Sequence, residues 1–225
     1  MALKLALFDC DGTLADSQHA IVAAMRPAFA RCGLAAPDEG AVRRSIGLSL
    51  PRLIATLTPG ADPALQSRLV DAYRDEYFSQ RTHADSVPEP LFTGIPAVLT
   101  ALASGGWQLG IATGKSQRGL LRLLDAHGIT DLFVTLQTAD FHPSKPDPSM
   151  ARAAMAQASV SASHCVVIGD TSFDMAMAKS AGAHAVGVAW GGHGTSELLA
   201  AGAAEVVPHT EQLVAAINRR LETMQ

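Results

Sequence analysis

The sequence predicts an α/β protein in which a doubly wound parallel sheet carries a helical unit inserted after its first strand. Short apolar runs alternate with helix-length segments through much of the 225 residues, the pattern of parallel strands joined by helices. These runs are continuously apolar, as expected for strands covered on both faces. The alternation is interrupted once, between about residues 15 and 88, where helical patterns dominate.

Each predicted strand is a run of five or six mostly apolar residues. The strands are expected at 3–8, 107–112, 132–136, 165–169 and 185–189. Helices are expected between and after them, at about 116–127, 148–158, 172–181, 195–202 and 209–222.

The inserted unit has the patterns HAIVAAMRPAFARCG and PALQSRLVDAYRDEYFS, which are typical of helices. The segment SVPEPLFTGIP, with three prolines and a glycine, is expected to return the chain to the sheet. We therefore expect a core domain of residues 1–14 and 89–225 and a helical cap domain of residues 15–88.

Composition excludes several classes of protein. A net charge of −4 argues against a broad nucleic-acid interface, and no apolar run of about 18 residues is present that could span a membrane. The first residues are expected to be a buried strand rather than a signal peptide. Three widely spaced cysteines (Cys10, Cys32 and Cys165) fit no disulfide or zinc pattern, so a reducing, cytoplasmic location is expected. The protein is expected to be a monomer or a homodimer.

The first candidate motif is Asp9-Cys10-Asp11-Gly12-Thr13, directly after the first predicted strand. Ligands bind open α/β sheets at the carboxyl ends of the strands, so paired carboxylates there suggest a site. The alternative is an Asx turn that merely ends the strand.

Three further polar clusters each follow a different strand. They are Thr113-Gly114-Lys115, Lys145 between Pro143 and Pro146, and Asp170-Thr171-Ser172-Phe173-Asp174. Taken singly, each has an ordinary explanation, namely a helix cap or a solvated lysine. Four such clusters at four strand ends favour one shared site. His193, in a glycine-rich loop, is expected to be an ordinary loop residue.

In order and approximate spacing, these clusters resemble the motifs of the haloacid dehalogenase superfamily, whose hallmark is Asp-x-Asp-Gly-Thr after the first strand. LADS (14–17), IGLSL (46–50) and GVAWGGH (187–193) resemble the phosphoglycolate phosphatase-like group, in which a helical cap follows the first motif. The resemblance implies a Rossmann-like core and a Mg²⁺-dependent phosphatase acting on a small phosphorylated metabolite, with phosphoglycolate as the default substrate.

The resemblance also implies residue roles. Asp9 attacks phosphorus to form an aspartyl phosphate, and Asp11 protonates the leaving oxygen and then activates water. Asp9, the main-chain carbonyl of Asp11 and Asp170 hold the metal. Asp174 assists directly, through water or by orienting Lys145. Thr113 and the Gly114 N–H bind phosphoryl oxygens, and Lys145 links Asp9 to the phosphate.

Related caps place the stretch around Gly47 against the active site, so Arg43 and Arg44 are expected to bind an anion on the leaving group. The alternative is that both arginines coat a solvated helix face. Two other functions stay open, a sugar phosphomutase and a phospho-accepting signalling domain. The second acid, Asp11, and the cap argue against the signalling domain.

Overall fold

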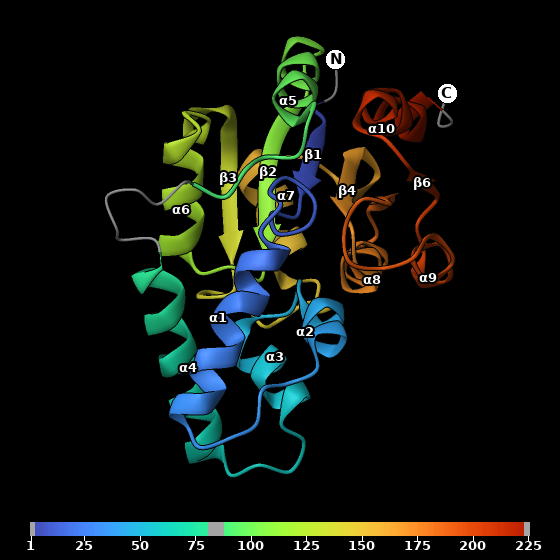
Figure 1. Ribbon diagram of the computed structural model, residues 1–225. Helices are drawn as coiled ribbons and strands as arrows, with labels where there is room; N and C mark the ends of the chain where they lie inside the picture. The colour runs from blue at the N-terminus through green and yellow to red at the C-terminus, as the bar shows by residue number, and fades with distance from the viewer. Residues whose placement is uncertain (1–2, 81–87, 223–225) are drawn as a thin grey trace.

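The computed structural model describes residues 3–80 and 88–222. Among these residues, six parallel strands form one sheet in the order β3-β2-β1-β4-β5-β6, and β3, β2, β1 and β4 follow one another from left to right in Figure 1. The strands are β1 (Leu5–Phe8), β2 (Gln108–Thr113), β3 (Phe133–Thr138), β4 (Cys165–Gly169), β5 (His184–Val188) and β6 (Glu205–Val207). The predicted doubly wound parallel sheet is confirmed. The short strand β6 was not predicted, because three residues carry too little pattern.

Helices cover both faces of this sheet. On one face, Ala6 and Phe8 of β1 pack with the buried sides of α5 (Ile95–Ser104), α6 (Gln117–Ala126) and α10 (Leu213–Glu222). On the other face, Leu5 and Leu7 pack with helices α7 (Ser149–Ala158), α8 (Ser172–Ala181) and α9 (Thr195–Ala201). Burial of alternate residues on opposite faces explains why β1 is continuously apolar.

Helix α5 was not predicted, since its first residues were assigned to the return linker. The helix starts after Gly94, whose φ of 88° favours a residue without a side chain, and Pro96 lies in its first turn. Its buried residues are Ile95, Val98, Leu99 and Leu102, which share one helical face. That face completes the core beneath β1 and β2.

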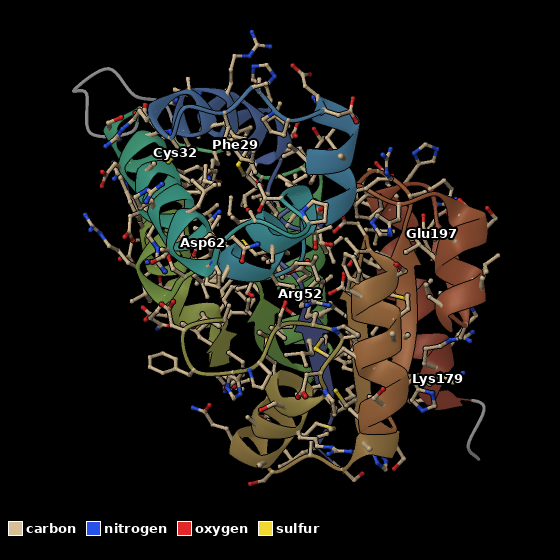
Figure 2. The ribbon with its side chains drawn as sticks, turned by 90° about the horizontal axis from the view of Figure 1, so that it is seen from below. Phe29, Cys32, Arg52, Asp62, Lys179 and Glu197 are labelled. Carbon is tan, nitrogen blue, oxygen red and sulfur yellow. The ribbon has the colours of Figure 1, made fainter. Side chains whose placement is uncertain are left out.

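Between β1 and β2, four described helices precede the core helix α5, which confirms the predicted helical insertion. They are α1 (Gln18–Arg31), α2 (Glu39–Ser45), α3 (Leu50–Leu57) and α4 (Pro63–Ser79). They enclose an apolar cluster of their own, and α1 and α4 lie side by side in Figures 1 and 2. The domain boundaries at residues 14–15 and 88–89 stay a proposal, because residues 81–87 of the return segment lie outside the described part of the chain.

The cap meets the core through the segment between α2 and α3, which we call the cap loop (residues 46–49). The main-chain N–H of Ser49 donates to Ser144 Oγ at 2.9 Å. A Cβ placed on Gly114 would lie 2.4 Å from the carbonyl oxygen of Leu48, so only glycine allows this approach. The cap loop therefore lies directly against the strand-end motifs of the core.

Across residues 3–80 and 88–222, no helix is both long enough and apolar enough to cross a bilayer.

Candidate active site

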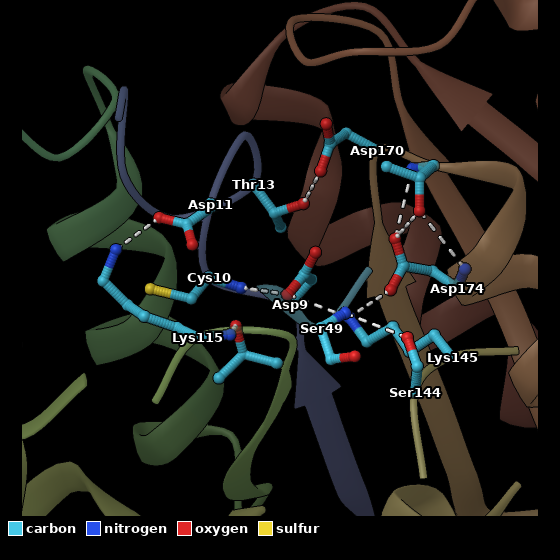
Figure 3. Close-up of polar contacts among 12 residues, drawn as sticks. Asp9, Cys10, Asp11, Thr13, Ser49, Lys115, Ser144, Lys145, Asp170 and Asp174 are labelled. Atoms are coloured by element: carbon cyan, nitrogen blue, oxygen red, sulfur yellow. Dashed lines mark hydrogen bonds and ion pairs between the residues drawn. The ribbon is translucent and has the colours of Figure 1, made fainter. Parts of the chain in front are cut away.

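The predicted motifs meet at the carboxyl ends of the central strands, on the edge of the sheet that faces the cap. Asp9 follows β1, Thr113 ends β2, Lys145 lies in the loop after β3, and Asp170 follows β4. In Figure 3, Asp9 lies between Asp11 on one side and Asp170 and Asp174 on the other. The order of strands places β1 between β2 and β4, so the site lies where the direction of strand addition reverses.

Asp9 is buried and held through one oxygen. Its Oδ1 accepts the Cys10 N–H at 2.7 Å and lies 2.9 Å from the Nζ of Lys145. Its Oδ2 is buried with no hydrogen-bond partner among the described residues. Burial raises the pKa of Asp9 well above its ordinary value, while Lys145 offsets part of that effect. A buried, ionised carboxylate with one unpaired oxygen is unfavourable, so a cation bound at that oxygen would stabilise the ionised form of Asp9.

Asp9, Asp170 and Asp174 form the candidate metal site. Each offers a carboxylate oxygen, and these oxygens all lie within 4.8 Å of one another. The only cation in direct contact with them among the described residues is Lys145, which leaves two excess negative charges when all three acids are ionised. Oxygen ligands and this charge suit a hard divalent cation such as Mg²⁺. The residues present therefore fit the metal that the family resemblance implied.

Asp170 is fixed from two sides. Its Oδ1 accepts from Thr13 Oγ1 at 2.8 Å, and its Oδ2 accepts the Gly192 N–H at 2.7 Å. Gly12, with a φ of 87°, approaches this carboxylate so closely that a Cβ would lie 2.3 Å from Oδ2. Burial, reinforced by the nearby Asp174, raises the pKa of Asp170 from 3.8 to about 6. This close contact with Asp170 of the fourth motif explains why the first motif has a glycine at position 12.

Asp174 links Lys145 to the start of a helix. Its Oδ2 accepts from the Oγ1 (2.6 Å) and the N–H (3.1 Å) of Thr171, which forms a capping box at the start of α8. Its Oδ1 accepts from Lys145 Nζ at 2.6 Å. Burial alone would lower the pKa of Lys145, but Asp174 and Asp9 outweigh it and raise that pKa. Lys145 is therefore a buried ammonium held between two carboxylates.

Asp11 has a different environment from the other acids. Its Oδ1 accepts from Ser17 Oγ at 2.6 Å and from Lys115 Nζ at 2.7 Å. Lys115 also donates to Tyr77 Oη at 3.0 Å and to Glu89 Oε2 at 3.3 Å. Sequence reasoning named Lys115 only as part of a motif and missed Tyr77 and Glu89, which come from distant segments. No local sequence signal marks those two residues.

Thr113 ends β2, and Gly114 follows it under the cap loop. Thr113 is buried, and its Oγ1 accepts the N–H of Lys115 at 3.1 Å. Gly114 lies against Gly47 and Leu48 of the cap. Gly114 borders the space between Asp11 and the cap.

The two arginines of the cap occupy different positions. Arg43 is half-buried and donates to Gln18 Oε1 at 3.5 Å. Arg44 is exposed and lines a groove of about 610 Å³ that also reaches Lys145. The structure thus brings Arg44, rather than Arg43, to the same groove as a strand-end motif.

His193 proves to be a buried contact between core and cap. One ring nitrogen lies 3.0 Å from the carbonyl oxygen of Arg44, and the other accepts the Ser172 N–H at 3.1 Å. The glycine-rich pattern around His193 indicated a loop but not this contact, because the partner lies in a distant helix.

Carboxylates, a lysine and a threonine follow the strands of this parallel sheet, beneath a helical cap, at the edge where open α/β sheets bind their ligands. The family model for haloacid dehalogenase-like hydrolases matches residues 6–188. The chain therefore belongs to this family, as its motifs predicted. The match includes the whole inserted cap and all four predicted motifs.

Curated relatives agree with this membership. The chain is 34% identical to the probable phosphatase IndB of Dickeya dadantii, over 97% of this chain and 95% of the relative. It is 32% identical to the phosphoglycolate phosphatase of Rhodospirillum rubrum, over 84% of this chain and 80% of that protein. The predicted phosphoglycolate phosphatase-like subgroup and the predicted enzyme class are confirmed.

Solved structures share the fold. The crystal structure of a predicted phosphatase from Clostridium acetobutylicum superposes with a TM-score of 0.85 at 24% identity, covering 97% of this chain and 100% of that one. A β-phosphoglucomutase from Clostridium difficile superposes with a TM-score of 0.78 at 22% identity, covering 98% of both chains. At this identity the likeness concerns the fold alone.

Proposed function

We propose that this protein is a Mg²⁺-dependent phosphatase that hydrolyses a small phosphorylated metabolite through an aspartyl phosphate on Asp9. The observation that carries the proposal is the buried Asp9 carboxylate, which is bound to Lys145 through one oxygen and has no hydrogen-bond partner among the described residues at the other. Relatives named as phosphatases and as phosphoglycolate phosphatases support the reaction class.

Asp9, Asp170 and the main-chain carbonyl of Asp11 would hold the ion. Mg²⁺ would supply positive charge that offsets the repulsion between these acids and a phosphate dianion. Asp174 has both oxygens engaged, one by Lys145 and one by Thr171. This supports a role for Asp174 in orienting Lys145.

In the first step, a carboxylate oxygen of Asp9 forms a bond to phosphorus while the bond from phosphorus to the leaving oxygen breaks. Asp11, in its protonated form, gives its proton to that oxygen and releases the alcohol. Thr113, the Gly114 N–H and Lys145 bind the phosphoryl oxygens during the transfer.

In the second step, Asp11 removes a proton from water as the water oxygen attacks the phosphoryl phosphorus. The bond between Asp9 and phosphorus breaks, which releases inorganic phosphate and restores the Asp9 carboxylate. Ser17 and Lys115 hold the Asp11 carboxylate between these proton transfers. The cap covers the site and excludes bulk water.

A sugar phosphomutase is the second candidate, because a β-phosphoglucomutase shares the fold over nearly the full length of both chains. A mutase would return the phosphoryl group from Asp9 to a sugar phosphate. Its activity would depend on a catalytic amount of sugar bisphosphate, whereas a phosphatase needs none and releases phosphate stoichiometrically.

The replacement Asp9→Asn tests the proposal. An amide is nearly isosteric with the carboxylate but is a poor nucleophile, so phosphate release over many turnovers with Mg²⁺ should be abolished while the circular dichroism spectrum is retained. Activity above a few per cent of the wild-type value would contradict the assignment of Asp9 as nucleophile.

A further inference from the structure

A chamber between the cap and the core opens beside Asp11. It has a volume of about 140 Å³, and Asp11, Gly114 and Lys115 contribute to its core side. Its cap side comes from α3, α4 and the cap loop, and includes the side chains of Ile46, Leu50, Leu53, Tyr73, Tyr77 and Phe78. Asp11 is the proposed proton donor to the leaving oxygen, so the chamber lies where the leaving alcohol would sit.

The walls of the chamber are mainly apolar and aromatic. Tyr73 and Tyr77 stack with ring centroids 5.4 Å apart, which gives the α4 side a rigid aromatic surface. Leu53 and Tyr73 are buried in the apolar cluster of the cap. Burial of an apolar group against such a surface favours binding, whereas burial of a polar group without a hydrogen-bond partner disfavours it.

Among the residues that the structure describes, the chamber has no cation available to pair with an anionic leaving group. A lysine ammonium has three protons, and those of Lys115 point to Asp11, Tyr77 and Glu89. Arg74, the other cation of the wall, is half-exposed and lies 3.6 Å from Asp71. A carboxylate placed among the apolar side chains would be buried without a partner, which is strongly unfavourable.

The volume of the chamber corresponds to one six-membered ring, such as benzene. An apolar cavity of about 150 Å³ in another protein binds benzene, and the chamber here measures about 140 Å³. A sugar ring of that size would bury hydroxyl groups against apolar walls, where each needs a hydrogen-bond partner.

On the basis of the proposed function, we infer that the preferred substrate is the phosphate monoester of an uncharged alcohol that carries an apolar, ring-sized group. The chamber binds that group, and the adjacent Asp11 protonates the oxygen that leaves. Phosphoglycolate, whose leaving group carries a carboxylate, is a poor fit to this chamber.

The first test compares benzyl phosphate, phosphoglycolate and methyl phosphate with the wild-type enzyme and Mg²⁺. Benzyl alcohol and glycolate both leave as primary alkoxides, so both depend on proton donation, and methyl phosphate reports the phosphoryl site without filling the chamber. We expect kcat/KM for benzyl phosphate to exceed that for phosphoglycolate by at least about tenfold, as is common for a fitting apolar group.

The second test fills the chamber. Leu50→Trp should lower the ratio of kcat/KM for benzyl phosphate to that for methyl phosphate by at least about tenfold. Ser67→Trp is the matched control, because Ser67 is an exposed residue of the cap helix α4 that lines neither the chamber nor the groove of Arg44. It should leave the ratio unchanged.

A preference for phosphoglycolate, above all one that is lost on replacing Arg43 or Arg44, would overturn the inference while leaving the proposed phosphatase function intact. Equal effects of the two tryptophan variants would overturn the assignment of the chamber. Failure to hydrolyse all three esters would instead contradict the proposed function itself. The comparison of esters needs no variant, so it holds even if Leu50→Trp does not fold.

Discussion

Replacement of Lys145 by Met removes the one ammonium in direct contact with the carboxylate cluster, as far as the described residues show. The Nζ atom lies 2.9 Å from Asp9 Oδ1 and 2.6 Å from Asp174 Oδ1, and the side chain has 0% of its surface exposed. Methionine keeps most of the apolar stem, so the change removes charge and hydrogen bonds more than volume.

The magnitude follows from these distances. With an effective dielectric constant of about 20, each contact contributes about 6 kcal/mol of Coulomb attraction, which desolvation of the three groups largely offsets. Breaking one side of a buried pair costs about 3–5 kcal/mol, because the remaining charge stays buried without its partner. We therefore expect metal-free Lys145→Met to be about 3–5 kcal/mol less stable than the wild type, and Mg²⁺ to restore part of that loss.

The kcat of Lys145→Met should fall by more than its loss of stability explains. Loss of one positioned donor to a transferring group typically lowers kcat about 10²–10³-fold, and Lys145 also orients Asp9. The assay is hydrolysis of 4-nitrophenyl phosphate at saturating Mg²⁺, together with denaturant unfolding with and without the ion. A change in kcat below about threefold in a folded variant would refute the role of Lys145.

Three further outcomes follow from the site. A chelator should abolish activity and Mg²⁺ should restore it, whereas Ca²⁺, with its looser and larger coordination, should inhibit by drawing Asp9 into bidentate binding; full activity in excess chelator after dialysis would contradict this. Replacing Arg43 or Arg44 with Ala separates the cap-anion prediction made from the sequence from the apolar chamber inferred above. The cap-anion prediction expects KM to rise more than about tenfold for an anionic substrate but to stay within about threefold for 4-nitrophenyl phosphate, whereas the apolar chamber expects no such selective rise. Equal changes for both substrates, or none, would contradict the cap-anion prediction. Burial, with Asp174, raises the pKa of Asp170 from 3.8 to about 6. The folded metal-free protein therefore binds this proton more tightly than the unfolded chain, and should gain up to about 3 kcal/mol of stability as the pH falls from above 6 towards 4. Affinity for Mg²⁺ should fall over the same pH window. The free energy of unfolding, measured across this pH range, should rise with falling pH in the wild type and rise less in Asp170→Asn. If the two proteins show the same dependence on pH, Asp170 is excluded as the source of the gain.

The candidate site was predictable to the extent that its residues follow buried strands. Asp9, Thr113, Lys145 and Asp170 each stand at the end of such a strand, and parallel strands end on one edge of the sheet. Helix α5 and strand β6 escaped prediction for local reasons. Residues 95 and 96 were assigned to a proline-rich linker, and three residues are too few to show a strand pattern.

The environment of Asp11 could not be predicted in the same way. Asp11 accepts from Ser17 and Lys115, and Lys115 in turn donates to Tyr77 and Glu89, so four different segments build this environment. Nothing in the spacing of Asp9 and Asp11 indicates that one carboxylate faces Lys145 and the other faces Lys115. That separation depends on how α4 and the start of α6 pack around the first motif.

The sequence by itself determined the fold class, the helical insertion and the family, because hydrophobic periodicity and short polar motifs are local properties of the chain. Only the tertiary structure decided which acids share a cation, that His193 joins the core to the cap, and that the space beside Asp11 is apolar and ring-sized. These features depend on distances between side chains that are far apart in sequence. Such distances are set by the close packing of whole elements, which no local pattern records.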